Sequence, residues 1–75
     1  MEFIEVVFTT KYGNFIMRFY KKGMFSDLSV GDVMNIVIKT YNDEKDYIYI
    51  SSVNENSMFI KKKFIVGFYA HEDYT

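Results

Sequence analysis

The sequence lacks most of the residues that carry catalysis or bind metals. None of its 75 residues is cysteine, and His71 is its single histidine. Without a thiol the chain has no disulfide, no thiolate ligand and no cysteine nucleophile, and one imidazole alone does not complete a metal centre. It also has no glycine-rich phosphate loop. We therefore expect a protein that is not an enzyme, with no catalytic residue, no metal and no cofactor.

One group of acidic residues remains as a candidate cation site. Asp43, Glu44 and Asp46 lie in a short polar segment, residues 42–46. A calcium loop has a glycine at its sharp turn and a bidentate glutamate at its end, and this segment has neither. We interpret the segment as a solvated loop between two strands.

The chain also lacks a dominant charge and a long apolar run. Ten acidic residues against nine basic ones give a net charge of −1, which excludes binding to nucleic acid or to an anionic membrane by bulk charge, although local basic patches stay possible. No run of about 18 apolar residues could span a bilayer. The N-terminal MEFIEVVF has neither the basic start nor the cleavage site of a signal peptide. We expect a cytoplasmic protein.

Aromatic residues, in contrast, are abundant. Eight Phe and seven Tyr make up 20% of the chain, and each buried ring removes roughly 150–250 Å² from water. A domain of this size buries only about 60% of its unfolded surface, so large rings must supply much of its core. There are too many rings for one small core, and we expect some of them on the surface, as a contact face or a dimer interface.

Hydrophobic periodicity predicts strands throughout, because β-branched and aromatic residues alternate with polar ones in short runs and no helical period stands out. The connector 21–32 is expected to hold one short helical turn at 26–28. Three consecutive lysines, residues 61–63, interrupt the last apolar stretch and predict a bulge, an edge or a strand break there. The predicted strands are 2–10, 15–20, 33–41, 47–53 and one or two within 58–70, with turns at 11–14, 42–46 and 54–57.

The segment 33–41 has the clearest alternation, and it predicts a hairpin with 47–53. With Tyr41 opposite Tyr47, Lys39 lies opposite Tyr49 on the outer face, and Ile50 points inward. Five or six short strands without proline or a helix favour a single all-β domain over residues 1–70, a small SH3-like or OB-like barrel. The polar residues 71–75 are predicted to form a frayed C-terminal tail.

Two segments resemble S1-type OB-fold domains. Residues 30–52, VGDVMNIVIKTYNDEKDYIYISS, are similar to the last hairpin of those domains, in which a Gly-Asp turn opens a strand and an acidic loop follows. Residues 12–16, YGNFI, look like their aromatic-Gly-x-aromatic-aliphatic element. The resemblance implies that Tyr12 and Phe15 stack on RNA bases. A Gly-Asp turn before a strand also occurs in other small barrels, including SH3-like ones.

Two binding surfaces follow from these expectations. The first is the outer face of the predicted hairpin, extended by the second strand, where rings beside cations suit a peptide or bases. The second is basic and suits nucleic acid. The simpler alternatives are tyrosines packed under loops or on a second copy, and lysines that protect strand edges. The first surface comprises Arg18, Tyr20, Lys39, Tyr41, Tyr47 and Tyr49; the second comprises Tyr12, Phe15, Lys21, Lys22, Lys61, Lys62 and Lys63.

Composition favours a small protein-interaction module that anchors on exposed rings. The richness in Lys, Ile, Asn and Tyr also indicates an AT-rich genome, such as those of low-GC bacteria and their phages, whose short proteins often inhibit host factors. An inhibitor or adaptor acting on a protein of the host cytoplasm is therefore the leading hypothesis. Binding of a nucleic acid or nucleotide is the first alternative, and a structural homo-oligomer subunit is the second.

Overall fold

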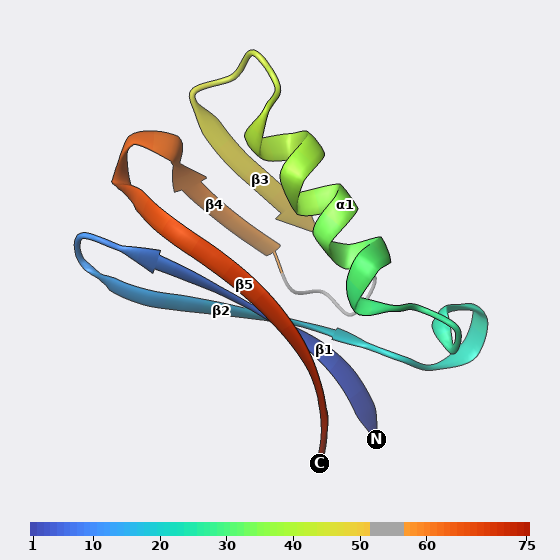
Figure 1. Ribbon diagram of the computed structural model, residues 1–75. Helices are drawn as coiled ribbons and strands as arrows, with labels where there is room; N and C mark the ends of the chain where they lie inside the picture. Colours follow the sequence, from blue (N-terminus) through green and yellow to red (C-terminus); the bar gives the residue numbers. More distant parts are fainter. Residues whose placement is uncertain (52–56) are drawn as a thin grey trace.

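Two antiparallel sheets and one helix make up residues 1–51 and 57–75, which are the residues that the computed structural model describes (Figure 1). One sheet has three strands in the order β2-β1-β5, and the other pairs β3 with β4. The expected all-β domain is confirmed in its coarser part, since strands dominate the described residues, but one α-helix is present. The elements are β1 (Glu2–Thr10), β2 (Gly13–Tyr20), η1 (Gly23–Phe25), α1 (Val30–Tyr41), β3 (Tyr47–Ser51), β4 (Ser57–Lys61), η2 (Lys62–Phe64) and β5 (Ile65–Tyr74).

Strands β1 and β2 form the hairpin that the sequence predicts. β1 covers the expected residues, and β2 starts at Gly13, which pairs with Thr10 across a two-residue turn. Gly13 has a φ of +124°, a conformation that other residues rarely adopt. The Thr10 hydroxyl donates to the Gly13 carbonyl at 2.8 Å and accepts from the Tyr12 amide at 3.1 Å. These bonds hold the turn and present Tyr12 to solvent.

The predicted strand over 33–41 is wrong, because this segment lies in helix α1. Ser29 caps the helix: its hydroxyl accepts from the Asp32 amide at 3.1 Å, and the Asp32 carboxylate accepts from the Ser29 amide at 3.0 Å. This capping box satisfies donors that a helix start otherwise leaves unpaired. Val33 and Val37, four residues apart, are fully buried against the core. Capping and packing thus override the strand propensity of the β-branched run.

The helix also removes the predicted hairpin between 33–41 and 47–53. β3 pairs instead with β4, and Tyr49 lies opposite Phe59. Ile48 and Ile50 face the core, as expected. Residues 52–53 of the predicted strand and residues 54–56 of the predicted turn lie outside the described residues. The short helical turn expected at 26–28 is found slightly earlier, as the 3-10 turn η1.

The C-terminal part contains both a confirmed and a wrong prediction. Of the bulge, edge or strand break predicted at the three lysines, the structure has a strand break, since the 3-10 turn η2 separates β4 from β5. The frayed tail over 71–75 is wrong, since β5 continues to Tyr74 beside β1 and the Thr75 amide donates to the Met1 carbonyl at 3.0 Å. Backbone pairing requires no apolar side chain, so polar residues can extend the sheet here: His71 contacts Glu5 on the outer face, and Glu72 pairs with Lys21.

The core lies where three surfaces meet: the inner face of the three-stranded sheet, the inner face of the β3–β4 hairpin, and α1. Figure 1 shows α1 alongside β3, with the three-stranded sheet crossing beside them. Within the described residues the two sheets are not hydrogen-bonded to each other, so a closed barrel is not confirmed. No helix in this part of the chain is long and apolar enough to cross a membrane. The core residues are Ile4, Val6, Phe8, Met17, Phe19, Val33, Val37, Ile48, Ile50 and Ile60.

The capping box gives a direct test of the helix. We expect Ser29→Ala to lower the free energy of unfolding by about 1 kcal/mol, because the Asp32 amide loses the Ser29 hydroxyl as its acceptor and the capping box is broken. Urea denaturation followed by circular dichroism measures the change. Ser26→Ala is the matched control, since Ser26 is exposed and its side chain bonds to no described residue. Equal stability of the two variants would contradict the assigned cap.

Candidate functional site

A groove runs between the edges of β2 and β4. Two hollows mark it, one of about 250 Å³ and the other of about 400 Å³. Together they are lined by β2 residues 15–18 and 20 and by all five residues of β4. Successive side chains of a strand point to opposite faces, so hollows that touch consecutive residues follow the strand edges and not one face of a sheet. We call this feature the β2–β4 groove.

The smaller hollow forms an aromatic end of the groove. Tyr12, Phe15 and Phe59 line it and are 74%, 47% and 60% exposed, respectively. Phe64 completes the ring set, edge-on to Tyr12 at 5.2 Å between centroids. The Lys11 amide donates to the Phe64 carbonyl at 3.1 Å and so ties the β1–β2 turn to η2. Four rings from three parts of the chain therefore surround one apolar hollow.

A second aromatic hollow adjoins this end at Phe59. It measures about 260 Å³ and is lined by Tyr49, Tyr47 and Lys45, among others. Tyr47 stacks on Phe59 with 4.7 Å between ring centroids and 24° between planes. The Lys45 ammonium lies 5.8 Å from the centroid of Tyr47, within range of a cation–π contact. The outer face of the β3–β4 hairpin thus continues the aromatic surface of the groove.

The charged residues that line the groove are both cationic. Lys61 borders the aromatic hollow and Arg18 the larger one, and none of the described residues that line either hollow is acidic. Lys61 is exposed and makes no ion pair with another described residue. Arg18 donates from Nε to Glu5 at 3.0 Å, and hydrogen bonds to Glu5 and then to Tyr20 raise its pKa above the ordinary value. Because Glu5 compensates the charge of Arg18, the net positive charge of the groove comes from Lys61.

The loop beside the adjoining hollow is fixed by Lys62. Its ammonium donates to the Asp43 carboxylate at 2.8 Å and to the Asp43 carbonyl at 2.9 Å, and its amide donates to the Asp46 carbonyl at 2.8 Å. The bond from Lys62, followed by the one from the Lys45 amide, lowers the pKa of Asp43 below its ordinary value. Asp43 thus stays ionised and serves a structural purpose in the acidic loop.

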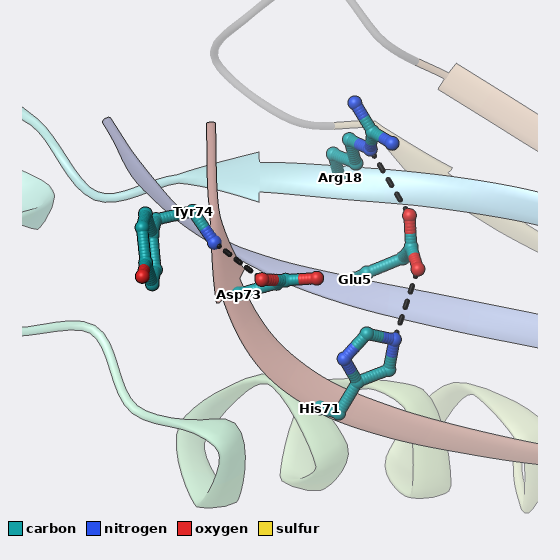
Figure 2. A network of polar contacts seen from close by, with 5 residues as sticks. All are labelled: Glu5, Arg18, His71, Asp73 and Tyr74. Carbon is teal, nitrogen blue, oxygen red and sulfur yellow. Dashed lines mark hydrogen bonds and ion pairs between the residues drawn. The ribbon is translucent and has the colours of Figure 1, made fainter.

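The outer face of the three-stranded sheet carries a polar network away from the core. Figure 2 shows Glu5 between Arg18 and His71, while Asp73 accepts from the Tyr74 amide. The Glu5 carboxylate is 14% exposed and lies 2.9 Å from Nε2 of His71. One acid from the central strand thus meets a base on each neighbouring strand. Glu5 compensates the charge of Arg18, and its contact with His71 ties that side chain into the sheet.

The first predicted surface is not one face. Lys39 and Tyr41 belong to α1, whereas Tyr47 and Tyr49 lie on β3. Tyr41 is half-buried and packs edge-on against Phe68 at 5.4 Å, so its ring supports the core. The prediction placed Lys39, Tyr41, Tyr47 and Tyr49 on one hairpin of 33–41 with 47–53, and this hairpin does not exist because 33–41 is helical. Arg18 and Tyr20 do share a location, since both line the larger hollow.

The second predicted surface is divided between two ends of β2. Tyr12, Phe15 and Lys61 come together at the aromatic hollow, near Lys63, whose ammonium lies 5.3 Å from the centroid of Phe64. Lys62 is held by Asp43. At the other end, Lys21 is ion-paired with Glu2 and Glu72. These contacts raise the pKa of Lys21, and the hydrogen bond to Glu72 has the largest effect. Lys22 is exposed just before η1.

Sequence reasoning missed Phe59, Phe64 and Lys45 as parts of the site. A signal for Phe59 was present: in residues 57–61 the apolar Met58 and Ile60 alternate with positions that face outward. Pairing this segment with 47–51 would have placed Phe59 beside the two tyrosines. The capping pattern Ser29-x-x-Asp32 was the corresponding signal for the helix.

Comparisons with protein-family models, with curated proteins and with solved structures found no match to this chain. Within residues 1–51 and 57–75, no three His, Asp or Glu side chains are grouped as metal ligands would be. The resemblance to S1-type domains included a strand over 33–41, where the structure has α1.

The Asp43–Lys62 contact gives a pH-dependent prediction. Folding lowers the pKa of Asp43, so its contribution to stability is fully present above about pH 4 and is lost as the pH falls through the lowered pKa. Asp43→Asn should therefore be less stable than the wild type at pH 7, with the difference shrinking toward pH 2. Urea denaturation across this range measures it. Asp27→Asn, at an exposed acid without a described partner, should show no such pH-dependent loss.

Proposed function

We propose that this protein is a non-enzymatic interaction module that binds a partner protein in the β2–β4 groove. The observation that carries the proposal is the aromatic hollow, where Tyr12, Phe15 and Phe59 remain exposed around a concave apolar surface. Exposed rings in a hollow are typical anchoring sites of protein interfaces, because a partner side chain buries apolar area on several sides at once.

The size of the hollow supports a side chain as its occupant. At about 250 Å³ it is smaller than the 300–1,000 Å³ of typical small-molecule sites. Its lining is apolar apart from Thr10 and Lys61, so it suits a large apolar side chain whose neighbours meet the cation at the rim. The adjoining rings of Tyr47 and Tyr49 extend the contact surface beyond this single anchor.

We further propose that the module acts as an inhibitor or adaptor of a host protein. An inhibitor or adaptor that acts on a host protein in the cytoplasm needs a small contact surface with strong anchors, and the groove offers one. We also propose that the domain is an open variant of an SH3-like or OB-like barrel, in which β2 and β4 approach each other without pairing within the described residues.

Phe59→Ser tests the location of the site. Affinity capture from cells that express the protein naturally should recover a partner protein with the wild type, and nuclease treatment should not change the amount recovered. The Phe59→Ser variant should recover at least about tenfold less of this partner, as expected for the loss of an aromatic anchor. Tyr69→Ser is the matched control, since Tyr69 is 54% exposed and lies outside the groove. Circular dichroism confirms folding of both variants.

Three results would count against the proposal. Equal capture by Phe59→Ser and Tyr69→Ser would place the interface elsewhere. Loss of the captured material on nuclease treatment would favour nucleic acid. Recovery of no protein above the level of an unrelated control would remove the interaction function.

Nucleic-acid binding is the second candidate, and one observation favours it. Tyr12 and Phe15, the rings implied in base stacking by the S1-type resemblance, share one hollow with Lys61. Stacked bases together with phosphate contacts give an affinity that falls steeply with salt. Titration of fluorescent single-stranded DNA and RNA at several salt concentrations tests this candidate. Binding that is absent at low salt would exclude it.

A further inference from the structure

Both strands that border the β2–β4 groove are edge strands. Within the described residues β2 pairs with β1 alone, and β4 pairs with β3 alone. An edge strand presents a row of unpaired N–H and C=O groups that can accept another strand. The hollows follow these two edges along residues 15–18 of β2 and 57–61 of β4, so the groove gives access to backbone as well as to side chains.

The β2 edge has few of the features that normally prevent strand addition. Natural edge strands are protected by proline, lysine, bulges or shortness. β2 is eight residues long, contains neither proline nor lysine, and keeps an unbroken register with β1. The opposite edge, β5, differs: its register shifts at Thr9 and Thr10 of β1, and its second half carries His71, Glu72 and Asp73. β2 is therefore the more regular and less protected edge of this sheet.

The charges of the groove indicate the chemistry of the strand that it accepts. Lys61 and Arg18 are the charged residues among its described lining, and both are cationic. A second copy that presented its own β2 would bring no acidic side chain to Lys61, because β2 contains none, so charge does not favour pairing between copies. An extended segment with acidic side chains would instead be attracted to Lys61 at the aromatic hollow.

On the basis of the proposed function, we propose that the partner contributes an extended, acidic segment that adds to β2 as a new strand. Main-chain hydrogen bonds to the β2 edge supply affinity, and alternate side chains supply specificity. One large apolar side chain enters the hollow between Phe15 and Phe59, and an acidic side chain meets Lys61. The added strand lies between β2 and β4 and covers the open side of the core.

Peptide selection on the intact protein tests this inference. A displayed library of short random peptides is selected on the immobilised chain, and the recovered peptides are synthesised. We expect alternating apolar and acidic residues with at least one aromatic or large aliphatic residue. Methylation of alternate backbone amides on one edge of such a peptide removes its donors to β2, and should weaken binding by about tenfold or more, whereas methylation on the other edge has less effect.

Amide hydrogen exchange gives a second readout that a simple side-chain contact would not change. Binding should slow exchange within residues 13–20, because amides on the free edge of β2 gain partners. Phe59→Ser should abolish peptide binding, whereas Tyr69→Ser should preserve it.

The outcomes separate this inference from the proposed function. If Phe59→Ser abolishes binding but methylation at either edge has no effect, the groove is the site and strand addition is wrong. Peptides that are basic, that lack a period of two, or that leave β2 exchange unchanged also overturn it. A failure to recover any binding peptide overturns it as well, while protein capture still tests the interaction function. Sedimentation as a dimer that Phe59→Ser dissociates would assign the groove to a second copy instead.

Discussion

The structure depends on covering the inner face of β1. This strand lies at the centre of the three-stranded sheet, and its Ile4, Val6 and Phe8 are completely buried. A three-stranded sheet cannot bury one of its faces by itself, so α1 and the β3–β4 hairpin must pack onto it. In a chain of 75 residues this one core supplies most of the apolar burial.

The open groove is a consequence of how that face is covered. The helix packs against β3 and β5, and the hairpin brings β4 to the side of β2 without hydrogen-bonding to it. Rings that cannot enter the small core then gather where the two sheets meet, at the tight β1–β2 turn and at η2. The aromatic richness of the sequence thus serves two purposes, since Phe8 fills the core while Phe15 and Phe59 form the proposed contact surface.

Ionic contacts play a supporting part around this arrangement. Glu5 joins all three strands of the larger sheet through Arg18 and His71, and Lys62 fixes the acidic loop beside the groove. Arg18 and Lys62 are thus compensated by acidic partners, whereas Lys61 is an exposed cation at the aromatic hollow. A net charge near zero therefore coexists with a positive groove.

The sequence by itself determined that strands dominate, the first hairpin, an interruption of the strand pattern at the three lysines and the inward positions of β3, because alternation and turn chemistry are local. It also named Tyr12, Phe15 and Lys61 as candidate residues, and the structure brings these three to one hollow. Only the tertiary structure decided that 33–41 is a helix, since its β-branched run suits either state and the Ser29 cap with burial of Val33 and Val37 selects one. It alone decided that residues 71–74 complete β5, because backbone pairing leaves no hydrophobic signal. The edge-to-edge approach of β2 and β4 was likewise outside the reach of the sequence, since it joins segments about forty residues apart through packing.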